Sequence, residues 1–367
     1  MKIRRLSWRS YRIPFRRTFV TSIGSETVRT GVIVRLEGES GLYGLGEIAP
    51  LRTGEERNIA YLLAVVERRI AGIKIDGICD LMEVTGRLDA REPVLAALRC
   101  GLDIAVSDLL AKAAGIPIAE FLGGCKRRSV PVNATISADT PDLAAQAARF
   151  AVDKGFRCLK LKVGMMDNIA AECELVAAVR DAIGPGVMLR IDANQAWSAK
   201  QAISTIAALE RFALEFVEQP VPARDIQGLT AVRKAVDTPI AADEPIKSKL
   251  SAGAIIESHA ADILVIKPMV VGGLREAIDI AHSARAGGIE SVITTTIDSG
   301  VGIAAALHLA AAIEDTRACG LATAELLECD LTLGTPQAVA GMIMCPDTPG
   351  LGVEIDEVKS TPYLDRA

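Results

Sequence analysis

Several residue patterns that mark other classes of protein are scarce in this chain of 367 residues. It has only 3 histidines, and its 8 cysteines are scattered without any CxxC pair. Zinc sites and disulfide frameworks need such residues at short, regular spacings, so neither is indicated. We expect free thiols, most of them packed in the core of a cytoplasmic protein.

Long apolar runs and strong positive charge are also missing. No apolar segment reaches the ~20 residues of a membrane-spanning helix, and the N-terminal sequence lacks the apolar core of a secretory signal. The formal net charge is −5, without a basic stripe. We therefore expect neither a membrane nor nucleic acid as a partner.

The composition that remains is that of a globular protein, with 50% hydrophobic and 24% charged residues. A chain of this length usually forms more than one core, so two domains are expected. Residues 1–125 contain two strand-like runs and a third at 42–47, followed by helical patterns over about 55–71 and 94–114. This order predicts a small α+β domain.

From residue 130 onward, strand-like and helix-like runs alternate. The expected strands are 130–136, 158–163, 187–192, 216–218, 240–243, 263–267, 291–296 and 320–323, with helices between them. Apolar strands joined by helices indicate parallel pairing, and eight of them suggest a closed barrel. The predicted fold class is α/β, a TIM-like (β/α)7β barrel over 126–330. An α+β N-terminal capping domain over 1–125 would be completed by the C-terminal tail, 331–367.

Charged residues end five successive strand-like runs. They are Lys162, Asp192, Glu218, Asp243 and Lys267, separated by 30, 26, 25 and 24 residues. Each interval fits one strand, one helix and two loops, so these side chains would meet at the C-terminal mouth of the barrel. A charge there is costly unless it is paired or binds a metal. Five in succession indicate an active site.

Three of these residues, Asp192, Glu218 and Asp243, are carboxylates on neighbouring strands. A ligand set of oxygens without histidine suits Mg²⁺, with Mn²⁺ as an alternative, rather than zinc. Asn194, two residues beyond Asp192, would face the same side and support the metal ligands.

The lysines suggest the reaction. Lys160 and Lys162 are two residues apart on a strand, so both face the barrel interior, and Lys267 lies across the barrel. Facing ammonium groups lower each other's pKa, and a lysine near neutrality can act as a general base. A divalent cation flanked by such lysines suits removal of a proton α to the carboxylate of a small substrate.

These residues lie in motifs that resemble the enolase superfamily, muconate-lactonizing-enzyme subgroup, whose lysine-and-magnesium sites are a recognised pattern. The matching segments are KLKVG (160–164), IDANQAW (191–197), EQP (218–220), ADEP (242–245) and IKPMVVGG (266–273). The resemblance covers nearly the whole chain. It implies that Lys160, Lys162 and Lys267 are catalytic, that the three carboxylates bind Mg²⁺, and that Glu244 supports them.

Within this subgroup the chain looks most like the o-succinylbenzoate synthases. The stretch TTTIDSGVG (294–302) resembles their carboxylate-binding text, and CGLATAELLECDL (319–331) resembles their eighth strand. The residues expected to bind substrate are Thr294, Thr295, Thr296, Asp298 and Ser299. The resemblance implies a dehydration in menaquinone biosynthesis through an enediolate. N-succinylamino-acid racemase, dipeptide epimerase and muconate-type cycloisomerase remain alternatives.

The eighth strand separates these alternatives. Dipeptide epimerases usually carry an Asp-x-Asp there for the substrate's ammonium group, and cycloisomerases a glutamate. Here Leu321, Ala322 and Thr323 offer no carboxylate, and Glu325 is unassigned.

Other charged side chains keep open interpretations. Arg16, Arg17 and Arg29 lie near or within the loop after Phe15, either binding a second substrate carboxylate or simply solvated. His259, His282 and His308 fall in helical patterns, so we expect them on the surface or satisfied in the core. We also expect a homo-oligomer.

Overall fold

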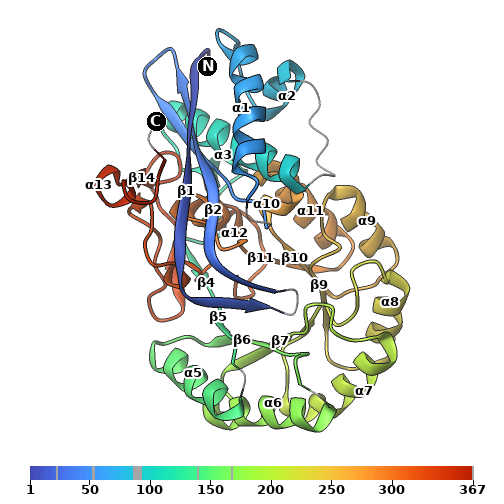
Figure 1. The fold of residues 1–367 in the computed structure, drawn as a ribbon. Coiled ribbons are helices and arrows are strands. Elements are labelled where there is room, and N and C mark those ends of the chain that lie inside the picture. The colour runs from blue at the N-terminus through green and yellow to red at the C-terminus, as the bar shows by residue number, and fades with distance from the viewer. Residues whose placement is uncertain (22–23, 52–53, 86–92, 139, 167, 366–367) are drawn as a thin grey trace.

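The computed structural model describes the whole chain except residues 22–23, 52–53, 86–92, 139, 167 and 366–367 (Figure 1). The strands are β1 Ile3–Thr21, β2 Gly24–Gly38, β3 Tyr43–Ile48, β4 Ser129–Pro131, β5 Ala134–Ile136, β6 Cys158–Lys162, β7 Met188–Asp192, β8 Val217–Glu218, β9 Ile240–Ala242, β10 Ile263–Ile266, β11 Glu290–Ile293, β12 Thr332–Leu333, β13 Met342–Met344 and β14 Glu354–Ile355. The helices are α1 Glu56–Ile70, α2 Ile78–Thr85, α3 Pro93–Ala114, α4 Ile118–Phe121, α5 Pro141–Asp153, α6 Ile169–Ile183, α7 Ala199–Leu209, α8 Ile226–Ala235, α9 Lys249–Glu257, α10 Pro268–Val271, α11 Leu274–Ala286, α12 Gly300–Ala312 and α13 Glu357–Ser360, with short 3-10 turns η1 Glu210–Phe212 and η2 Ala324–Leu326.

Seven parallel strands form one curled sheet in the order β11-β10-β9-β8-β7-β6-β5. Two parallel bridges, Val132 with Cys319 and Thr294 with Gly320, join its two edges through residues 319–320. This short segment takes the place of an eighth strand, so the predicted (β/α)7β barrel is confirmed. Helices α5 to α9 and α11 surround the sheet in Figure 1.

The barrel helices begin at residues whose side chains cap them. Thr140, Asn168 and Ser198 accept a backbone N–H from the first turn of α5, α6 and α7, and Ser198 forms a capping box with Gln201. Such caps satisfy amides that have no partner within the helix.

The interior of the barrel is filled below its mouth. Phe216, Ala241, Ile263, Val265 and Val292 form a separate buried cluster inside the sheet, as expected of a barrel core packed in layers. Because side chains alternate between the two faces of a strand, the residue two positions beyond each of these also faces the interior, nearer the mouth. The site described below therefore rests on an apolar layer.

The capping domain consists of the antiparallel sheet β1-β2-β3 with α1 to α4. Its long β1–β2 hairpin extends from this domain over the barrel (Figure 1). Phe15 pairs with Leu327, and Glu328 N–H donates to Pro14 O at 2.9 Å. The hairpin thus contacts the loop that follows the eighth strand position.

The C-terminal tail contacts both parts of the molecule. Strand β13 pairs with β4 beside the barrel, whereas Leu364 pairs with Tyr11 of β1. The fold class with a tail that completes the capping domain is confirmed, and the residue limits of the domains stay a prediction.

Several elements differ from the sequence expectation. Strand β8 has only two residues, and the eighth strand is reduced to its two bridges. Helices α2, α10 and α13 were not expected because they are short or lie outside the alternating pattern. Within the described residues, every helix is too short or too polar to span a bilayer.

Candidate active site

Strand register places three of the predicted residues side by side. Lys162 on β6 is level with Asp192 on β7, which is level with Glu218 on β8. Asp243 and Lys267 follow directly after β9 and β10. Leu159 and Leu161 are fully buried on the outer face of β6, so Lys160 and Lys162 point inward.

The three lysines contact the three carboxylates directly. Lys160 Nζ lies 2.8 Å from Asp192 Oδ2 and 2.7 Å from Glu218 Oε1. Lys162 Nζ donates to Asp192 Oδ2 at 2.6 Å, and Lys267 Nζ donates to Asp243 at 2.5 Å. All six predicted catalytic and metal-binding side chains are thus brought together at the barrel mouth.

The electrostatics of the lysines differ from the expectation. Burial alone would lower the pKa of Lys160, but the negative charges of Asp192, Glu218 and Asp243 outweigh it and raise that pKa. The predicted lowering by a facing ammonium group is therefore wrong for Lys160 in this arrangement. The physical reason is proximity. Oxygens of Asp192 and Glu218 lie within 2.8 Å of the Lys160 ammonium group, and their attraction outweighs the repulsion from a second lysine.

The carboxylates respond in opposite directions to the same cluster. Burial, with the charge of Asp192 adding to it, raises the pKa of Glu218 to about 8. Burial would also raise the pKa of Asp192, but Lys160 and Lys162 together hold it below its ordinary value. Burial and the charge of Asp243 raise the pKa of Glu244 to about 7. The cluster therefore has more buried negative charge than its lysines compensate.

This excess of oxygen donors fits a hard divalent cation. Glu244 Oε2 is buried and has no hydrogen-bond partner among the described residues. No nitrogen or sulfur ligand belongs to the set, which suits Mg²⁺. As placed, no three described histidine, cysteine or acidic side chains form a ready coordination sphere. Lys160 Nζ bridges Asp192 and Glu218 in this arrangement.

Two residues beside the carboxylates hold the left-handed backbone conformation that non-glycine residues seldom adopt. Asn194 has φ 42° and Gln219 has φ 39°. Asn194 accepts from Lys162 Nζ at 2.7 Å and donates to Glu244 at 3.3 Å. Gln219 accepts the backbone N–H of Asp243 at 3.0 Å. Both therefore orient the charged cluster, and the sequence analysis had missed Gln219.

The predicted substrate-binding residues after β11 lie at the mouth but already have partners. The Thr294 hydroxyl donates to Gly320 O at 2.9 Å, and the hydroxyls of Thr295 and Thr323 lie 3.0 Å apart. Thr296 donates to Asp298 Oδ1 at 2.5 Å. The Ser299 hydroxyl donates to Glu47 of the capping domain at 2.7 Å. Their role in substrate binding stays a prediction.

The eighth strand position presents a neutral wall. Gly320 is level with Thr294, and a side chain at Gly320 would meet the Thr294 hydroxyl at 2.3 Å. Ala322, two residues on, is partly exposed. Glu325 points away from this wall, because it is exposed and pairs with Lys154 at 3.0 Å.

One residue of the inner face was missed by sequence reasoning. Thr135 on β5 is level with Lys160 and is exposed although it lies within the sheet. Neighbouring residues of a parallel pair point to the same face, so Thr135 faces the mouth. Alternation within the expected strand 130–136 was a signal for it.

The arginines fall into two groups. Arg16 and Arg17 are exposed, and Arg16 donates to Glu328 O at 3.1 Å. Arg29 is only 1% exposed and donates to the backbone carbonyls of Ala49, Pro50 and Ile297. It is neither a solvated loop residue nor free to bind a substrate carboxylate.

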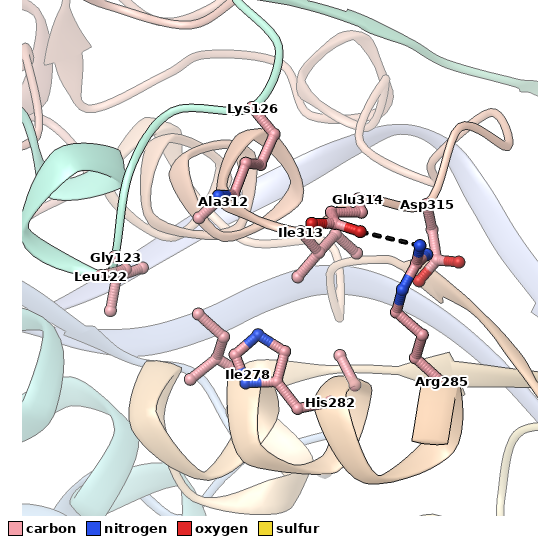
Figure 2. A pocket seen from close by; sticks show the side chains of 11 residues that line it. Leu122, Gly123, Lys126, Ile278, His282, Arg285, Ala312, Ile313, Glu314 and Asp315 are labelled. Carbon is pink, nitrogen blue, oxygen red and sulfur yellow. Dashed lines mark ion pairs between the residues drawn. The ribbon is translucent and has the colours of Figure 1, made fainter. Parts of the chain in front are cut away.

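The three histidines confirm the expectation that each lies on the surface or is buried with hydrogen-bond partners. His259 and His282 are exposed, and His308 is buried with hydrogen-bond partners on both ring nitrogens. His282 lines a surface cleft of about 270 Å³ beside the Arg285–Glu314 ion pair (Figure 2). This cleft contains none of the predicted site residues. All eight cysteines are free thiols.

Comparison with known families covers both parts of the chain. Residues 6–123 match the mandelate racemase / muconate lactonizing enzyme N-terminal domain, and residues 142–359 match the enolase C-terminal domain-like family. The matched segments follow the capping domain and the barrel.

Curated relatives carry several activities. The hydrophobic dipeptide epimerase of Enterococcus faecalis is 35% identical over 360 residues, 96% of this chain and 99% of that protein. The N-succinyl-L-Arg/Lys racemase of Bacillus cereus is 30% identical over 97% of this chain and 96% of its own. The o-succinylbenzoate synthase of Thermobifida fusca is 40% identical over 207 residues, 56% of this chain and 63% of that protein.

Solved structures agree with these relatives. The E. faecalis dipeptide epimerase, complexed with Mg and the dipeptide L-Leu-L-Tyr, has a TM-score of 0.90 at 33% identity, over 96% of this chain and 100% of that one. The N-succinyl Arg/Lys racemase of B. cereus has a TM-score of 0.91 at 28% identity, with 100% of both chains covered. With both domain families matched, and with lysines and carboxylates gathered at the barrel mouth, this chain is an enzyme of the enolase superfamily, in its mandelate racemase / muconate lactonizing enzyme group.

Proposed function

We propose that the protein is a Mg²⁺-dependent enzyme that removes the proton α to a carboxylate, and that its substrate carries no free amino group. Its reaction would be the dehydration catalysed by o-succinylbenzoate synthases. The observation that carries this proposal is the neutral wall at Gly320 and Ala322, with Glu325 turned away to Lys154.

Asp192, Glu218 and Asp243 would hold the ion, with Glu244 and Asn194 behind them. Bound Mg²⁺ supplies positive charge against the dianion that develops on the substrate carboxylate. Lys162 Nζ takes the α-proton and then, as an ammonium group, returns it to the departing hydroxide on the same face. Lys267 stands four strand positions away, on the opposite wall, where its ammonium group stabilises the enediolate.

The charge of the wall supports this substrate class. A free ammonium group bound at the mouth would be removed from water without a carboxylate partner, at a cost of several kcal/mol. Among the described residues 319–324, none is acidic. Neutral small residues leave room instead for a ring or an acyl chain.

A second candidate is supported by a separate observation. Lys162 and Lys267 lie on opposite walls, which also suits a two-base racemisation, with one lysine on each face of the α-carbon. The N-succinyl-L-Arg/Lys racemase relative matches nearly the whole chain. An N-succinylamino-acid racemase satisfies the same neutral wall, because its substrate has an acylated nitrogen.

A small substrate library followed by NMR in D₂O tests the proposal. It contains the cyclohexadiene carboxylate precursor of o-succinylbenzoate, N-succinyl amino acids and L,L-dipeptides with a free N-terminus. We expect dehydration of the first and little exchange with the dipeptides. Ala322→Asp, which adds an acid to the wall, should shift exchange towards dipeptides. Fast exchange with dipeptides alone in the unmodified enzyme would reject the proposal, and fast exchange with N-succinyl amino acids alone would favour the second candidate.

A further inference from the structure

A buried hydrogen-bonded cluster joins the capping domain to the loop that follows β11. Arg29 of β2 donates from Nε to Ile297 O at 2.9 Å, from Nη1 to Pro50 O at 2.7 Å and from Nη2 to Ala49 O at 2.6 Å. One guanidinium group therefore connects β2, the segment after β3 and a loop of the barrel. A rigid fork of donors is what such a three-way connection requires.

The loop that Arg29 holds has an unfavourable backbone. Ile297 has φ 66°, a left-handed conformation that is a true outlier for a β-branched residue. Its neighbours are held as well, because Arg29 Nη2 donates to the Thr296 hydroxyl at 3.2 Å and lies 3.9 Å from Asp298 Oδ1. Strain of this kind persists only where surrounding contacts enforce it, and it gathers at functional sites.

A second capping-domain residue holds the other end of the same loop. Glu47 of β3 is fully buried and accepts the Ser299 N–H at 2.9 Å and the Gly302 N–H at 2.8 Å, in the first turn of α12. The Tyr11 hydroxyl donates to the same carboxylate at 2.5 Å. A carboxylate at a helix N-terminus is favourable, and here it comes from the other domain.

The residues just before this loop form part of the mouth. Thr294 bridges to Gly320 and closes the barrel, and the Thr295 hydroxyl meets that of Thr323 after the eighth strand position. Among the described residues, the hydrogen bonds of Arg29 go to other groups than these two threonines. The positions of these two threonines depend on the segment that follows them, residues 296–302, which Arg29 and Glu47 hold.

We propose that Arg29 is a positioning residue of the active site. It holds residues 296–298 in their left-handed turn, so that docking of the capping domain sets Thr294 and Thr295 at the substrate end of the mouth. The expected effect on substrate binding rests on the proposed function, whereas the expected effect on the loop does not.

The full-length variants Arg29→Met and Arg29→Lys test this, with Arg190→Met and Arg190→Lys as matched controls. Arg190 is also 1% exposed and pairs with Glu215 at 2.7 Å, but its guanidinium group lies over the ring of Phe216, within the apolar layer of the barrel. One measurement is amide hydrogen exchange of residues 295–302 by mass spectrometry. The other is kcat and KM with whichever substrate of the library is turned over.

For Arg29→Met we expect faster exchange in residues 295–302 and a loss of roughly 10²-fold in kcat/KM, as for a small misplacement of substrate contacts. Most of the loss should fall on KM, because the reacting lysines lie on other strands. Arg29→Lys should be intermediate. The Arg190 variants should lose thermal stability without a change in the exchange of residues 295–302.

Equal loop exchange and equal KM in the Arg29 and Arg190 variants would overturn the proposal. If Arg29→Met does not fold, the comparison of Arg29→Lys with Arg190→Lys decides in the same way. If no substrate of the library is turned over, the proposed function fails, and the exchange of residues 295–302 still decides the role of Arg29.

Discussion

Lys162 is the residue on which the proposed chemistry depends most. Its Nζ lies between Asp192 and Asn194 at the barrel mouth. We expect Lys162→Ala to slow α-proton exchange with D₂O by ~10²–10⁴-fold, the usual contribution of a general base. Proton NMR of the substrate in D₂O measures this exchange. Lys249→Ala, at an exposed lysine paired with Asp279, is the control. Exchange near the unmodified rate in Lys162→Ala would refute the assignment.

The carboxylates allow a test that needs no substrate. Asp192→Asn, Glu218→Gln and Asp243→Asn should each weaken Mg²⁺ binding in a calorimetric titration, since each removes a charged oxygen ligand. The fold should survive, because the charge of Asp192 disfavours ionised Glu218 and its removal relieves repulsion. Glu290→Gln is a control of equal charge change at an acid that pairs with Arg317. Unchanged Mg²⁺ affinity in any two of the three variants would refute the metal assignment.

At the scale of elements, the capping domain depends on the close approach of α3 to β3. A side chain at Gly46 would meet Gly101 O of α3 at 1.9 Å, and one at Gly44 would meet Ala105 O at 1.9 Å. Only hydrogen fits at these points, so the helix lies directly on the strand that carries Glu47. The mouth loop is thus held by a strand whose own position is set by two glycines.

Gly46→Ala should therefore be destabilising. Its new methyl group cannot be accommodated against backbone atoms, and overpacking of this kind costs about 1–3 kcal/mol. Denaturant unfolding measures the change in the free energy of unfolding. Gly186→Ala serves as the control, because nothing lies within 4 Å of the added carbon. An equal effect of both substitutions would show that β3 and α3 can separate at little cost.

At the scale of the whole molecule, His308 joins three parts of the chain. Its Nδ1 accepts the N–H of Ala119 in α4 at 3.2 Å and lies 3.3 Å from Cys345 Sγ of the tail. Its Nε2 lies 3.1 Å from Leu351 O. The ring thus links barrel, capping domain and tail as a neutral imidazole, and burial lowers its pKa to about 4.

This junction predicts a pH dependence of stability. Between pH 6.5 and 4 the unfolded chain binds a proton at His308 and the folded chain does not, so stability falls as the pH falls. The full loss is about 3 kcal/mol, because the pKa of His308 falls from its ordinary 6.5 to about 4 on folding. Unfolding of the unmodified protein and of His308→Gln should be compared over this range. The difference between the two should shrink towards pH 4, and a difference independent of pH would contradict the account.

The sequence by itself determined the order of elements and the positions of the charged strand ends. These are local signals: the periodicity of apolar residues, capping residues such as Ser198, and the spacing of the five charges. A parallel sheet must be buried on both faces, which leaves few ways to arrange the elements. Helix α8, Ile226–Ala235, lies between two of the expected strands, 216–218 and 240–243, for this reason. Lys162, Asp192 and Glu218 could be placed on one level because strands of a barrel end at one mouth.

Only the tertiary structure decided what those residues touch. The raised pKa of Lys160, the outward turn of Glu325 to Lys154 and the burial of Arg29 all depend on partners distant in the chain. At the eighth strand position the barrel is closed by two bridges, which the periodicity of apolar residues in the sequence could not show. Desolvation and ion pairing are set by distances between elements, and sequence spacing contains no information on those distances until the barrel has closed.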